Sequence, residues 1–186
     1  MQDIVTLLKE SEIEILSVHA KRDIGIYLCS DKAEDVEEGI RLIDETLEFA
    51  SKIGSSICVF HLWDTWKEDF DLGFIRKIFS QISSQYPNIK ASVENIPTHL
   101  EGHTPYDIVK DFRYITLDLQ WAALYDEFEK FIELKDKIAN IHLRGKLQDS
   151  KWVIKNSSFS FYETLNLIRD SWDYGGVLTM EPNGLK

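Results

Sequence analysis

The chain has 186 residues and a net charge of −11, and 44% of its residues are hydrophobic. This length and apolar fraction suit one domain with a large core. The acidic balance argues against nucleic acid as a partner, because phosphate binding needs a basic face. No apolar run approaches the roughly 20 residues of a membrane span. The N-terminal segment does not read as a signal peptide, and Cys29 and Cys58 form no CxxC pair. We therefore expect reduced thiols in a cytoplasmic protein.

Apolar segments of strand length alternate with segments of helical periodicity along the whole chain. Strands are expected at residues 13–19, 56–62, 89–95, 114–119, 138–143 and 176–181. Helices are expected at residues 3–10, 31–53, 72–85, from 104 for a short stretch, 125–135 and 160–170, with a polar loop over 21–30. Capping boxes are expected at Asp31 with Glu34 and at Ser160 with Glu163, and a C-terminal cap at Gly54.

Near-continuous apolar strands separated by helices are typical of a parallel sheet covered by helices. A doubly wound open sheet and a (β/α) barrel both fit this pattern. The turn after the first strand reads HAKRDIG and lacks the glycine-rich sequence that a doubly wound nucleotide binder usually carries. The sequence therefore predicts an α/β fold of the TIM type, an incomplete (β/α) barrel with about six parallel strands in a single domain over residues 1–186.

Each expected strand carries a residue of metal-ligand type at or near its C-terminal end. These residues are His19, His61, Glu94, Asp118, His142 and Glu181. In a barrel the C-terminal ends of the strands meet at one rim, where chemistry collects. An unpaired carboxylate in an apolar strand is costly, so Glu94 and Asp118 each need a cation or hydrogen-bond donors. A histidine in a strand is more often a hydrogen-bonded structural residue, so His19 and His61 are predicted only to border the pocket.

Three further residues have a functional and an ordinary interpretation. Trp63 and Trp121 either line the pocket or pack as other aromatic side chains do. Arg144 either holds a phosphate or carboxylate group or is simply solvated.

The motifs SVHA, H-L-W, VEN, TLD, I-H-L-R and LTMEP occur in this order and resemble the xylose-isomerase-like TIM-barrel superfamily. That group includes sugar-phosphate isomerases and epimerases and the apurinic-site endonucleases. The resemblance implies that the chain lacks the first two strands and the last helix of the barrel. It also implies one divalent metal held by Glu94, Asp118, His142 and Glu181. Three carboxylates and one imidazole suit Mn²⁺, Mg²⁺ or Co²⁺ better than zinc.

The activity implied by the resemblance is isomerisation or epimerisation of a small sugar or sugar phosphate, in carbohydrate metabolism. The metal polarises the substrate carbonyl. One of Glu94 and Glu181 removes a proton from the adjacent carbon, and the other returns a proton after an enediolate forms. The substrate would lie among His19, His61, Trp63, Trp121 and Arg144.

Two departures from the family pattern bear on this interpretation. Trp121 and Gly145 stand where the endonucleases have a histidine and an aspartate that help hold several zinc ions. Their replacement favours a single-metal site and counts against a nuclease. A non-catalytic metal- or ligand-binding subunit remains as an alternative, and a phosphodiesterase or apurinic-site endonuclease relative as a further one.

Six strands would leave one edge of the barrel open, between the strands at 13–19 and 176–181. Exposed strand edges tend to pair. We therefore expect a homodimer, or binding of a partner, across this edge. The alternative is that the N-terminal helix covers the opening with Ile4, Leu7 and Leu8.

Overall fold

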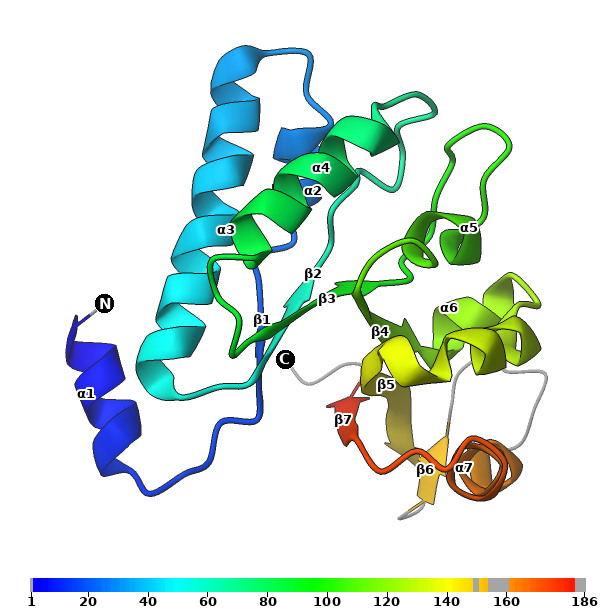
Figure 1. The fold of residues 1–186 in the computed structure, drawn as a ribbon. Helices are drawn as coiled ribbons and strands as arrows, with labels where there is room; N and C mark the ends of the chain where they lie inside the picture. The colour runs from blue at the N-terminus through cyan, green and yellow to red at the C-terminus, as the bar shows by residue number, and fades with distance from the viewer. Residues whose placement is uncertain (1, 149–150, 154–160, 183–186) are drawn as a thin grey trace. The chain divides into compact units, whose positions relative to one another are not determined.

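A computed structural model describes residues 2–148, 151–153 and 161–182. The chain divides into two compact units, labelled with their helices and strands in Figure 1. Unit 1 comprises Met1–Val93 with Thr98–Glu101, and unit 2 comprises Glu94–Pro97 with Gly102–Lys186. Among the described residues, no helix is both long and apolar enough to cross a membrane.

Unit 1 contains a sheet of parallel strands, as the sequence predicts. Its strands are β1 (Ser17–His19), β2 (Ile57–Phe60) and β3 (Lys90–Glu94), of which the last residue belongs to unit 2. β2 pairs with β1 on one side and β3 on the other, and all four of its residues are buried. The strand expected over 13–19 is shorter than predicted, since only its last three residues pair with β2. Ile13 and Leu16 are 64% and 46% exposed.

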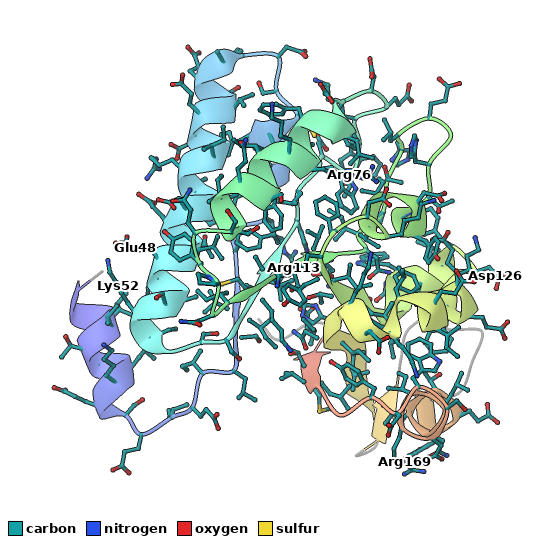
Figure 2. All side chains as sticks on the ribbon, viewed as in Figure 1. Glu48, Lys52, Arg76, Arg113, Asp126 and Arg169 are labelled. Carbon is teal, nitrogen blue, oxygen red and sulfur yellow. The ribbon has the colours of Figure 1, made fainter. Side chains whose placement is uncertain are left out.

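The helices of unit 1 are α1 (Gln2–Glu10), α2 (Ile24–Leu28), α3 (Ala33–Ile53) and α4 (Leu72–Ser83). α3 contacts each of the other three, and Figure 1 shows α3 and α4 crossing as neighbours. An ion pair of 2.8 Å joins Lys52 and Glu48 on the exposed side of α3 (Figure 2). α1 leaves Ile4 and Leu7 55% and 66% exposed.

Two local predictions in unit 1 are wrong. The expected loop over 21–30 contains α2, which lies so close to the backbone of Trp63 that a Cβ on Gly25 would overlap the Trp63 carbonyl. The predicted capping box of α3 is absent: the cap residue is Lys32, without a side-chain hydrogen bond, and Asp31 pairs instead with Lys67 at 3.1 Å. The predicted C-terminal cap is confirmed, because Gly54 is left-handed with φ of 80°.

Unit 2 contains the parallel strands β4 (Tyr114–Asp118), β5 (Ile138–Gln148) and β7 (Val177–Pro182). β5 is central, pairing with β4 on one side and β7 on the other. The register places Asp118 level with His142, and Arg144 level with Glu181. β5 is longer than the predicted 138–143, because its extension forms an antiparallel hairpin with β6 (Lys151–Val153).

The helical elements of unit 2 are α5 (Pro105–Val109), α6 (Leu119–Leu124), the 3₁₀ helix η1 (Phe128–Lys137) and α7 (Phe161–Asp170). α5 begins with a complete capping box of Thr104 and Asp107. The α-helix predicted over 125–135 is wrong in type and start: η1 is 3₁₀ and α6 precedes it. α7 ends at Asp170 as expected, whereas its predicted cap at Ser160 lies outside the described residues.

Candidate metal centre

Three of the four metal ligands implied by the family resemblance lie together in unit 2. Glu94 ends β3, Asp118 ends β4, and His142 lies at the same level on β5. Their side chains are 0%, 0% and 2% exposed. Each offers one ligand atom, and these three atoms lie within 4.8 Å of one another. The parallel register thus brings together residues that are 24 positions apart in the chain.

Glu181, the fourth implied ligand, joins this cluster from β7. Its Oε1 lies 3.1 Å from Nδ1 of His142, while Oε2 of Glu94 lies 3.4 Å from the same nitrogen. The imidazole is therefore within reach of two carboxylates. Glu181 is 24% exposed and Glu94 is fully buried, so Glu181 is the carboxylate more open to solvent.

Arg144 lies against all three carboxylates. Its Nε donates to Oδ2 of Asp118 at 2.8 Å. Its Nη2 lies 2.7 Å from Oε2 of Glu181 and 3.5 Å from Oε1 of Glu94. The guanidinium carbon is 5.4 Å from the ring centre of Trp121, and the side chain is 14% exposed. The sequence-based alternatives for Arg144 included holding a carboxylate of a ligand, but the carboxylates it contacts are those of the protein itself.

The charges of this cluster perturb one another. Burial alone lowers the pKa of Arg144, but Asp118, Glu181 and then Glu94 raise it above its ordinary value, so the guanidinium stays charged. Burial, together with repulsion from Glu94, raises the pKa of Asp118 to about 6. The pairing with Arg144 acts in the opposite direction and lowers this pKa.

Asp118 also accepts hydrogen bonds from the backbone at the start of α6, and these bonds fix the direction of its side chain. Its Oδ1 accepts hydrogen bonds from the backbone N–H groups of Gln120 at 2.8 Å and Trp121 at 3.3 Å. Asp118 is therefore the N-cap of α6 as well as the last residue of β4. The chain turns from strand to helix at this residue, and only Oδ2 is directed to the cluster.

Asn95 is a site residue that the sequence reasoning missed. It is fully buried, and its side-chain amide pairs with the backbone of Asp118 in both directions. Oδ1 of Asn95 accepts from the Asp118 N–H at 2.6 Å, and Nδ2 donates to the Asp118 carbonyl at 3.2 Å. The amide thus holds the backbone at Asp118, which is a candidate metal ligand. The available signal was a polar residue directly after Glu94 in an apolar segment.

The donor set of the cluster fits a divalent cation. Carboxylate oxygens with one imidazole nitrogen suit Mg²⁺, Mn²⁺ or Co²⁺, and buried carboxylates in close contact require positive charge. Glu94, Asp118, His142 and Glu181 would hold such an ion.

The remaining predicted site residues lie in unit 1. The rings of His19 and His61 meet edge to face with their centres 4.8 Å apart, and Nδ1 of His19 is 2.8 Å from the carbonyl oxygen of Ala20. Trp63 is only 2% exposed, in the core of the protein. This burial agrees with the alternative that Trp63 packs as other aromatic side chains do.

Comparison with protein-family models and with curated protein sequences gives no match. Solved structures do match. A D-tagatose 3-epimerase-like protein aligns with 99% of this chain and 76% of its own, at a TM-score of 0.70 and 22% identity. A 3-keto-D-glucoside 4-epimerase from E. coli aligns with 100% of this chain and 78% of its own, at a TM-score of 0.69 and 14% identity. An AP endonuclease of family 2 from Brucella melitensis aligns with 97% of this chain and 78% of its own, at a TM-score of 0.66 and 16% identity.

These likenesses define the fold. The chain shares the TIM-barrel type of fold of these solved structures, several of which are described as sugar isomerases or epimerases. The predicted fold class, an incomplete TIM-type barrel, is confirmed at this level.

Proposed function

We propose that the protein is a metal-dependent isomerase or epimerase of a small sugar or sugar phosphate. The observation that carries the proposal is the convergence of Glu94, Asp118 and His142, with ligand atoms within 4.8 Å of one another, beside Glu181. The likeness in fold to sugar epimerases supports the same class of reaction. A bound divalent metal would supply Lewis-acid polarisation of the substrate carbonyl.

The side chains of the cluster would carry out the proton transfers and hold the metal in position. Epimerisation beside a carbonyl needs a proton to leave one face of a carbon and another to arrive at the opposite face, so two bases serve better than one. Glu94 and Glu181 are two carboxylates within 3.4 and 3.1 Å of the same imidazole nitrogen. We assign proton removal to one of them and proton return to the other. Asp118 and His142 fix the position of the metal, and the half-buried face of Trp121 borders the site.

Metal content is the first test. The purified protein, reconstituted with Mn²⁺, should contain one divalent ion per chain by elemental analysis. Glu94→Ala and Asp118→Ala should contain little. If the wild type retains no more metal than these variants, the metal-dependent proposal fails.

The second test measures the chemistry directly. The metal-loaded protein in D₂O should introduce deuterium beside the carbonyl of at least one member of a panel of ketoses, aldoses and their phosphates, observed by NMR. Glu181→Gln should lose the exchange, and Glu129→Gln, a control at an exposed glutamate of η1, should keep it. No exchange across the panel would favour the alternative of a non-catalytic metal- or ligand-binding subunit. Cleavage of abasic DNA would favour a nuclease.

We also propose that β7 takes part in assembly of a homodimer. Leu178 and Met180, which alternate with Thr179 and Glu181 along β7, are 45% and 55% exposed. Apolar side chains exposed beside a strand edge favour pairing with another chain. Sedimentation velocity at micromolar concentration should show a dimer, and Met180→Lys should shift it toward the monomer. A wild type that sediments as a clean monomer would contradict the proposal.

A further inference from the structure

Both oxygen atoms of Asp118 accept hydrogen bonds in the structure, which limits how this residue binds a metal. Oδ1 caps α6 through two backbone N–H groups, and Oδ2 accepts from Nε of Arg144 at 2.8 Å. Binding a cation through Oδ1 would remove the cap of α6. The oxygen left for a metal is Oδ2, which Arg144 holds.

The two glutamates show the same competition. Each directs one oxygen to the imidazole of His142 and the other to Arg144. The guanidinium therefore contacts every carboxylate that the proposed metal needs. A divalent cation at these oxygens would stand within a few ångströms of a permanently charged arginine, where like charges repel strongly in a buried site.

We propose that the guanidinium of Arg144 and a divalent metal are alternative occupants of the carboxylate cluster formed by Glu94, Asp118 and Glu181. The inference rests on the metal-binding part of the proposed function. When no metal is bound, Arg144 neutralises part of the buried negative charge of the three carboxylates. Metal binding breaks its hydrogen bond to Asp118, so Arg144 weakens metal affinity and makes loading reversible. It acts as a positioning residue through the carboxylates.

The first experiment compares Mn²⁺ affinity by calorimetry for the metal-stripped wild type and Arg144→Gln. Glutamine retains hydrogen-bonding ability but removes the charge. We expect Arg144→Gln to bind Mn²⁺ more tightly by on the order of tenfold or more, a size typical of changes around a metal's ligands. A residue that merely supported the structure would change affinity in the opposite direction when replaced.

Arg113→Gln is the matched control. Arg113 is also in unit 2 and also stacks on an aromatic ring, with its guanidinium carbon 5.2 Å from the centre of Tyr114, but it is exposed and has no contact with the carboxylates among the described interactions. This variant should bind Mn²⁺ as the wild type does. An Arg144→Gln affinity equal to or weaker than that of the wild type would overturn the inference.

A second measurement uses the wild-type protein and does not depend on the folding of Arg144→Gln. The ¹⁵N-labelled Nε–H of Arg144, assigned with Arg144→Lys, should be protected from solvent exchange in the metal-free protein. Saturation with Mg²⁺ should remove that protection. An Nε–H signal that remains protected and unshifted at saturation would show that Arg144 keeps its place and would refute mutual exclusion.

The outcomes separate this inference from the proposed function. Equal Mn²⁺ binding by the wild type and Arg144→Gln would refute the inference and leave the metal site standing. Binding by Arg144→Gln alone would support the inference and argue against a metal-dependent activity of the native chain. If neither protein binds Mn²⁺, both proposals fail.

Discussion

Replacement of Asn95 by alanine tests how the candidate metal centre is held together. The substitution removes two buried hydrogen bonds to the backbone of Asp118, one of 2.6 Å and one of 3.2 Å. A buried polar group that loses its partner costs about 1–3 kcal/mol. Two groups are affected, and a water molecule entering the vacated space would offset part of the loss. We therefore expect the free energy of unfolding to fall by about 2–4 kcal/mol.

Urea denaturation measures this change as a lower midpoint at an unchanged slope. Asn88→Ala, at an exposed asparagine, is the control and should change stability by less than about 0.5 kcal/mol. Asn95→Asp keeps the shape and the acceptor but places an oxygen opposite the Asp118 carbonyl, so it should not rescue stability. The reasoning is refuted if Asn95→Ala resembles Asn88→Ala, or if Asn95→Asp is as stable as the wild type.

Two further predictions concern the scaffold. Gly25→Ala should destabilise unit 1 by about 3 kcal/mol or more in a urea titration, because the added Cβ would overlap the Trp63 carbonyl. Gly175→Ala is the control: nothing lies within 4 Å of its added Cβ, so stability should change by less than about 1 kcal/mol. Equal midpoints for these two variants would contradict the close approach of α2. Thr104→Ala should cost about 1 kcal/mol by removing the hydrogen bond that caps α5, and Thr104→Ser should recover most of it; a full loss in both variants would show that the cap is not the cause.

The site residues that the sequence identified were those whose position follows from strand periodicity. Glu94 and Asp118 end apolar strands, and parallel pairing carries strand ends to one edge whatever the details of packing. His142 follows by the same rule, since it lies level with Asp118 on β5. The structure places these three as the sequence predicts, while their role as metal ligands stays a prediction.

Short helices were harder to predict because their own sequences barely favour them. α2 and α6 have five and six residues, fewer than an isolated helix needs to be stable. α2 exists because Gly25 allows it to lie on the backbone of Trp63, and α6 exists because the carboxylate of Asp118 caps its first N–H groups. Both short helices depend on these contacts, and the hydrophobic periodicity of the sequence does not predict them.

The alternation of strands and helices, and the candidate ligands at or near the strand ends, can be read from the amino-acid sequence alone, because backbone periodicity is encoded locally. Which charged groups come into contact at this site depends on how the strands pack in three dimensions. Arg144 reaches carboxylates 26 and 50 residues earlier in the chain, at Asp118 and Glu94. Asn95 reaches the backbone of Asp118, 23 residues later. Such pairings depend on register and on the direction of each side chain, and both are fixed only when the strands pack together.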